Sequence, residues 1–173
     1  MKAATKSTAA GAALFLAFAV GLSAQSPIIK PVPKTETKGV PVPQHAVGPF
    51  DVKVVPLPPD DKVGDPSIAR MSLDKQFHGD LEATSKGLML AMGDAKTSAG
   101  YVAMERVSGT LHGRKGTFAL QHTGTMTRGV ASLSVTVVPD SGTEELTGIA
   151  GKLDIKIAEG KHSYDFEYTL PAQ

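Results

Sequence analysis

Apolar and polar residues alternate along nearly the whole chain after residue 48, and this alternation constrains the fold more than any other feature. Period-two alternation predicts strands with one buried face, and no long helical period competes with it. Eight short segments at regular spacing predict an all-β domain, an eight-stranded antiparallel up-and-down β-barrel, with a sandwich as the alternative. The alternating apolar sets are Phe50, Val52 and Val54; Met71, Leu73 and Phe77; Leu88, Leu90 and Met92; Tyr101, Ala103 and Val107; Phe118 and Leu120; Leu133, Val135 and Val137; Leu153, Ile155 and Ile157; and Tyr164, Phe166, Tyr168 and Leu170.

The first 24 residues have the pattern of a secretory signal peptide. Lys2 and Lys6 precede an uncharged apolar stretch over residues 9–22, and small residues around Ala24 offer a cleavage site. The alternative is a membrane anchor, but the apolar run is short for a span. We therefore expect a secreted or periplasmic protein, cleaved near Ala24, without a stable membrane span.

A proline-rich segment over residues 25–47 follows. Its prolines disfavour a helix or a central strand, so we expect a disordered, partly extended linker, with a proline-rich ligand segment or a cell-wall spacer as alternatives. Residues 48–173 then form the barrel domain, about 125 residues and enough for one core. The prolines are Pro27, Pro31, Pro33, Pro41 and Pro43.

Composition limits the possible functions. Loss of Lys2 and Lys6 with the signal peptide reduces the 18 basic residues to 16, against 17 acidic residues, for a formal net charge of −1. The chain holds 3 Tyr, 6 Phe and no Trp, so neither a basic face nor many stacking rings indicates nucleic-acid binding. The chain has no cysteine, which excludes a disulfide framework.

Dipeptides that contain glycine predict the strand registers. Gly113-Arg114, taken as a two-residue type II′ turn, sets Glu105 directly opposite His122. Turns at Arg128-Gly129 and Glu159-Gly160 likewise align apolar residues with apolar residues. The predicted pairs include Val107 with Leu120, Gly109 with Phe118, His122 with Val135, Leu120 with Val137, and Ile155 with Tyr164.

The segment 139–146 predicts a structured connection. Residues 139–142 form a turn pattern, and Thr143 precedes two glutamates that favour the start of one short helical turn. We expect this connection to plug one end of the barrel, with a ligand-binding loop as the alternative.

Several motifs together resemble an uncharacterised bacterial family, the domain of unknown function 3224 family, which has an allene oxide cyclase-like barrel. They are the runs 100–106, 109–111, 113–118, 121–122, 138–143 and 162–164, within a match over roughly 48–170. The resemblance implies an eight-stranded barrel and a possible homo-oligomer, but no established activity. No motif matches the cyclase's catalytic residues, so none is transferred.

Glu105 and His122 are the main candidates for a site, because both belong to the apolar face of their strands. Such a pair can act as a general acid or base, or it can be a structural ion pair that holds the register. Lys75 shares the face of Leu73 and Phe77, thirty positions before Glu105. It either neutralises Glu105 across the barrel or extends out of one end.

Tyr101, Tyr164 and Tyr168 are further candidates, because hydroxyl-bearing rings suit a small-molecule pocket, although such rings more often belong to a plain core.

Neither a metal site nor a hydrolase triad is expected. His78, Asp80 and Glu82 share one face, but the outer two would stand about 13 Å apart in a straight strand. Ser134 alternates away from its apolar neighbours, so it cannot join His122 in a triad. We therefore expect no metal and no cofactor.

Three functions remain open from the sequence. The first is an exported barrel that binds a small, largely apolar molecule, oriented by Glu105, His122, Lys75 and the tyrosines. The second is a metal-independent isomerase or cyclase that uses the same interior. The third is a filled structural barrel that acts through its surface.

Overall fold

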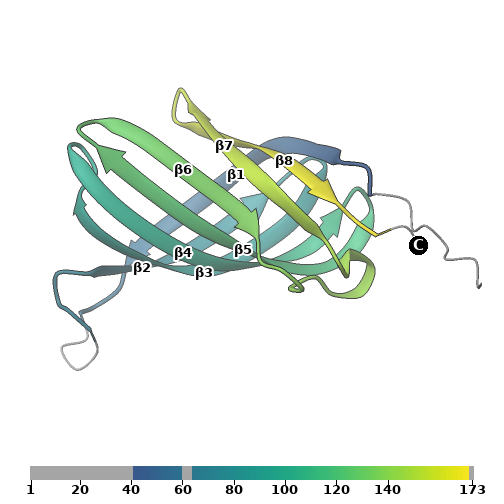
Figure 1. The fold of residues 1–173 in the computed structure, drawn as a ribbon, viewed down its shortest axis with the longest axis horizontal. Helices are drawn as coiled ribbons and strands as arrows, with labels where there is room; N and C mark the ends of the chain where they lie inside the picture. The colour runs from purple at the N-terminus through teal and green to yellow at the C-terminus, as the bar shows by residue number, and fades with distance from the viewer. Residues whose placement is uncertain (1–40, 60–63, 172–173) are drawn as a thin grey trace, which may run out of the picture. The chain divides into compact units, whose positions relative to one another are not determined.

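The computed structural model describes residues 41–59 and 64–171, and these residues form a closed antiparallel β-barrel in chain order (Figure 1). The predicted all-β, eight-stranded barrel is confirmed. The strands are β1 (Gln44–Pro56), β2 (Ala69–Phe77), β3 (Leu81–Asp94), β4 (Ser98–Leu111), β5 (Arg114–Thr127), β6 (Val130–Val137), β7 (Ala150–Ala158) and β8 (Lys161–Thr169). In the described ranges, the single helical segment is the 3-10 turn η1 (Glu144–Leu146), and no helix there is long and apolar enough to cross a membrane.

The predicted signal peptide and most of the proline-rich segment lie outside the described residues. β1 begins at Gln44, a few residues before the expected boundary at Gly48, and pairs from there with β8. Gln44 stands opposite Tyr168, and Ala46 is fully buried opposite Phe166. The domain therefore takes in the last residues of the segment that its prolines marked as a linker.

The two ends of the barrel differ in how they are filled. At the closed end lie the β2–β3 and β4–β5 turns and the β6–β7 connection, and large buried side chains fill the interior there. Aromatic rings dominate this core: Phe118 stacks on Phe166 with centroids 5.6 Å apart, and Phe77 meets the edge of Tyr164 at the same separation. At the open end lie the β3–β4 and β5–β6 turns, and the inward side chains are partly exposed.

The β6–β7 connection covers the closed end, as predicted. Leu146 and Ile149 of this segment are buried in the core. Thr143 does not cap η1 through its side chain; its Oγ1 instead accepts a hydrogen bond from the backbone N–H of Thr117, 3.0 Å away. Because the β5–β6 ladder ends at Leu120, the connection satisfies backbone groups of β5 that β6 leaves unpaired.

The predicted register of β4 and β5 is wrong by two residues, whereas the registers of β5–β6 and β7–β8 are confirmed. The β4–β5 turn is His112-Gly113, with both residues at positive φ (47° and 78°), as a type I′ turn requires. Glu105 therefore pairs with Leu120, and His122 with Ala103. A shift of two residues keeps every side chain on its face, so both candidates still point inward.

The apolar set of β3 faces the opposite way from the other sets. Leu88, Leu90 and Met92 are 42%, 39% and 51% exposed and lie on the outer face. Leu81 and Ala83 point inward instead and are buried. Both faces of this strand carry apolar residues, so alternation alone could not say which one meets the core.

Candidate functional site

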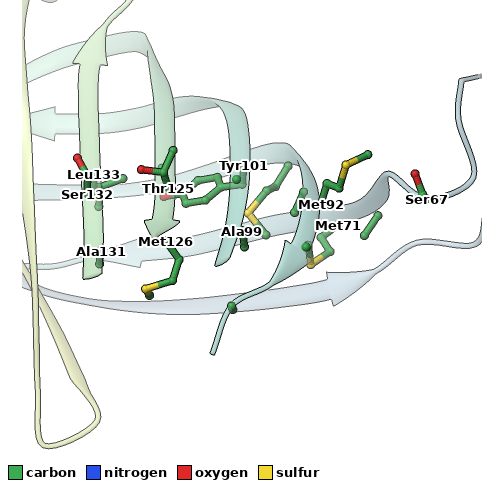
Figure 2. Close-up of a pocket in the computed structure, with 17 residues that line it drawn as sticks. Ser67, Met71, Met92, Ala99, Tyr101, Thr125, Met126, Ala131, Ser132 and Leu133 are labelled. Carbon is green, nitrogen blue, oxygen red and sulfur yellow. The ribbon is translucent and has the colours of Figure 1, made fainter. Parts of the chain in front are cut away.

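The inside of the open end contains a cavity of about 530 Å³ (Figure 2). It lies between the start of β2, the β3–β4 turn and the start of β6, so five consecutive strands form its wall. Its lining is mainly apolar, with a concentration of methionine and alanine. The main lining side chains are Met71, Met89, Ala91, Tyr101, Met126 and Leu133.

The cavity exists because small residues occupy inward positions that larger side chains fill at the closed end. Ala99 and Ala131 line it on β4 and β6. On β5, Gly124 stands directly opposite Tyr101, and a Cβ added to Gly124 would lie 2.1 Å from Cε1 of the tyrosine ring. The absence of a side chain at Gly124 thus lets the Tyr101 ring pack against the wall and leaves the space above it open.

Tyr101 provides a polar group in this apolar cavity. Its hydroxyl makes no hydrogen bond to any described residue, yet it is not a buried unsatisfied atom, so it faces accessible space. Burial of the ring raises the pKa of Tyr101, and the negative charge of Glu105 raises it further. The phenol therefore stays protonated and can donate a hydrogen bond to a bound molecule.

A buried charged cluster lies deeper in the barrel, toward the closed end. Lys75 Nζ donates to Glu105 Oε1 over 2.7 Å, and the Ser85 hydroxyl donates to Oε2 over 2.7 Å. His122 Nε2 lies 2.9 Å from the same Oε1. The Lys75 ammonium also stands 5.4 Å from the centroid of the Phe50 ring. The lysine therefore neutralises Glu105 inside the barrel, over the intervening strand β3, and does not extend out of one end.

The surroundings of Glu105 keep it ionised. Burial by itself would raise the pKa of this carboxyl, but the hydrogen bond from His122, the charge of Lys75 and the hydrogen bonds from Lys75 and Ser85 outweigh that effect. Together they lower the pKa of Glu105 to about 2. The carboxylate therefore acts as an acceptor and a fixed negative charge, and proton transfer through it is disfavoured near neutral pH.

Glu105 also determines the tautomer of His122. A carboxylate can only accept, so Nε2 must carry the proton and donate it to Oε1. Nδ1 has no hydrogen-bond partner among the described residues, although every fully buried polar side-chain atom there has one. Since His122 points inward, Nδ1 faces open space inside the barrel. His122 occupies the next inward position of β5 from Gly124 toward the closed end. Glu105 thus orients an imidazole whose second nitrogen is free.

The other two tyrosines do not line the cavity. The Tyr164 hydroxyl accepts from the N–H of Leu81 (2.9 Å) and donates to the carbonyl of His78 (3.0 Å). The Tyr168 hydroxyl donates to Gln44 Oε1 (3.0 Å) and lies 2.7 Å from His112 Nδ1. Burial is the main cause that raises the pKa of both phenols. Both hydroxyls therefore bond within the closed end.

His78, Asp80 and Glu82, the three residues considered as metal ligands, form polar contacts with different groups. β2 ends at Phe77, so a turn, and not a straight strand, carries His78, and the expected separation of about 13 Å is wrong. His78 Nδ1 lies 3.8 Å from Glu82 Oε2, while Asp80 accepts the N–H of Val47. In the described parts of the chain, no three His, Cys, Asp or Glu side chains gather closely enough to hold a metal ion.

The fold and the site together define a small eight-stranded β-barrel with an apolar cavity at one end and a buried charged cluster below it. The family model for the proteins of unknown function DUF3224 matches residues 46–168, and the chain belongs to this family. The chain is similar to a crystal structure of a DUF3224 protein with unknown function from Shewanella oneidensis MR-1. That protein is 47% identical, with a TM-score of 0.68, and the match covers 76% of this chain and 100% of the other. A comparison with curated proteins finds no match.

Proposed function

We propose that this protein is an exported barrel that binds a small, largely apolar molecule in the cavity at the open end. The observation that carries the proposal is the cavity itself, about 530 Å³ and lined mainly by Met and Ala side chains. Pockets for small molecules commonly have volumes of roughly 300–1,000 Å³, apolar walls and a few polar groups. An interior filled along its whole length would have favoured a structural role.

The methionines of the lining support a ligand that is recognised mainly by shape and apolar contact. Met71, Met89 and Met126 come from three different strands and surround the space. Methionine has an unbranched, polarizable side chain that adapts to irregular apolar surfaces. This lining favours an uncharged hydrocarbon or aromatic body over a sugar or a phosphorylated compound.

We propose that Tyr101 and His122 supply the polar groups that form hydrogen bonds with the ligand. Tyr101 lines the cavity and offers its hydroxyl, and His122 offers Nδ1 from the layer below. Glu105 and Lys75 act as positioning residues, because Glu105 accepts the hydrogen bond from His122 and Lys75 donates to the same carboxylate oxygen. Tyr164 and Tyr168 are left out of this assignment, because their hydroxyls are already used at the closed end.

A metal-independent isomerase or cyclase remains the second candidate. The favouring observation is that His122 is oriented by a carboxylate in the way that a general base requires. In this alternative, Nδ1 would remove a proton from a bound molecule and the Tyr101 hydroxyl would donate one.

Capture of an uncharged naphthylamine fluorophore by the purified full chain tests the binding proposal. The probe's emission should rise with wild type and rise much less with Ala131→Phe, which fills the cavity. Ala158→Phe is the matched control, because Ala158 is exposed and does not line the cavity. Equal capture by both variants would contradict binding at this place. Native mass spectrometry of the same samples identifies molecules carried from the host, and their chemical conversion would favour the enzyme.

Export is tested separately. We expect expression of the whole chain in a bacterial host to give a periplasmic or secreted product whose N-terminus is near Gln25. A cytoplasmic product with an intact N-terminus would contradict this part of the proposal and leave the binding test unaffected.

A further inference from the structure

The outer face of β3 and β4 carries a continuous group of exposed apolar side chains. We call this group the apolar strip. Each member is between 39% and 51% exposed. Single exposed apolar residues are common on protein surfaces, but a contiguous group of large ones indicates an interaction surface. The strip consists of Leu88, Leu90 and Met92 on β3 and Val102 and Met104 on β4.

The register makes the strip compact. Leu90 pairs directly with Val102, and Leu88 pairs with Met104. Met92 pairs with Gly100, where the lack of a side chain leaves a shallow depression on the outer face. Because the barrel is closed, the strip cannot be covered by adding a strand at an edge and must be covered by a face.

Opposite charges bound the two ends of the strip along β3. Lys86 precedes Leu88 by two residues on the outer face, and Asp94 follows Met92 by two residues at the end of β3, where its Oδ1 accepts a hydrogen bond from the N–H of Lys96 over 2.9 Å. Lys86 stands opposite Arg106, which makes that end basic. Lys86 is 3.7 Å from Asp74 of its own barrel, but its side chain is 87% exposed and therefore remains available to a partner.

We propose that the apolar strip binds a second copy of this chain in a two-fold dimer. A two-fold axis in the interface plane, perpendicular to the strands at Leu90 and Val102, sets each strand antiparallel to its copy. Lys86 then faces Asp94 of the second copy at both ends. On β4, Met104 faces Gly100 of the second copy, so a protruding side chain meets a depression.

The charge pattern is what favours a second copy over an unrelated partner. An isologous interface requires a surface that complements itself after reversal, and the sequence Lys86-x-Leu88-x-Leu90-x-Met92-x-Asp94 has this property about Leu90. Since the curved wall offers only two strands, we expect a small interface of the weak, reversible class. The dimer does not depend on the ligand proposal.

Sedimentation velocity of the full chain, from micromolar to millimolar concentration, tests the dimer. We expect wild type to pass from monomer to dimer. Lys86→Asp and Asp94→Lys should each raise the dissociation constant by about tenfold, and the double variant should restore it. Met104→Lys should abolish the dimer, whereas Lys53→Asp, on the exposed face of β1, should leave it unchanged. Circular dichroism confirms that each variant is folded.

The outcomes separate the parts of the proposal. A wild-type monomer throughout the range overturns it. A dimer that tolerates Met104→Lys overturns this face as the interface. Weakening by both single charge reversals without recovery in the double variant overturns the antiparallel arrangement, and recovery supports both the face and its register.

Discussion

Glu105 and His122 share a 2.9 Å hydrogen bond although they stand diagonally across β4 and β5. Their direct partners are Leu120 and Ala103, and long side chains reach diagonal neighbours on the same face of a sheet. Lys75 binds the same carboxylate oxygen from β2. Ser85 of β3 donates to the other carboxylate oxygen, so the cluster links four consecutive strands, β2 to β5, and its loss should affect the stability of the whole barrel.

Replacement of Lys75 by Met should destabilise the protein strongly. The change leaves the buried Glu105 carboxylate without its cationic partner, and removing one member of a buried pair costs about 3–5 kcal/mol. Urea denaturation measures the free energy of unfolding. Lys53→Met, on the exposed face of β1, should change it by no more than about 0.5 kcal/mol. Similar small losses for both variants would show that the cluster contributes little.

The cluster should also make stability depend on pH. The pKa of Glu105 is about 2 in the barrel, against 4.5 for an ordinary glutamate. A carboxyl with a lowered folded-state pKa contributes stability that is fully present above pH 4.5 and is lost as the pH falls toward 2. We expect wild type to lose on the order of 3 kcal/mol more than Glu105→Gln over this range. Parallel curves of stability against pH for the two proteins would contradict this.

Gly124→Ala should displace the Tyr101 ring into the cavity. The new methyl group would lie 2.1 Å from Cε1, so the ring must move, at a cost of about 1–3 kcal/mol. Capture of the naphthylamine fluorophore should fall with stability. In a Tyr101→Ala background, the same Gly124→Ala change should cost much less, because the clashing ring is gone. An equal cost in both backgrounds would show that the ring does not depend on this glycine.

Leu146→Ala should lower stability without changing probe capture. Leu146 is buried at the closed end, and its truncation should cost about 2–5 kcal/mol in thermal or urea unfolding. The cavity lies at the opposite end, so the folded variant should bind the fluorophore as wild type does. Reduced capture by a fully folded variant would mean that the two ends are coupled.

Much of this architecture could be predicted from residue alternation. The alternation correctly predicts inward positions for Lys75, Glu105 and His122. The two-residue error in the β4–β5 register does not affect this prediction, because the side-chain period of a strand is two. The turn was harder to predict, since the first central position of a type I′ turn, which His112 occupies here, usually carries Asn, Asp or Gly. The sequence allows two positions for Lys75, in a salt bridge with Glu105 or extended out of one end, and the packing of the interior decides for the salt bridge.

The cavity and the apolar strip could not be deduced in this way. Both depend on the curvature of the barrel wall and on which face of β3 points inward. Leu81 and Ala83 belong to the inward set, whereas Leu88 and Leu90 belong to the outward set. The cavity volume depends on many side chains at once. The sequence shows small inward residues near Tyr101, but it does not show whether side chains from other strands fill the space beside them.

The sequence by itself determined the all-β class, the number of strands and the inward direction of the charged residues, because these follow from local alternation and turn chemistry. Closure into a barrel decided the rest. It brought Lys75 within 2.7 Å of Glu105, gave the Tyr164 and Tyr168 hydroxyls partners at the closed end, and left the open end hollow. Such contacts join residues far apart in the chain, so only the three-dimensional packing could settle them.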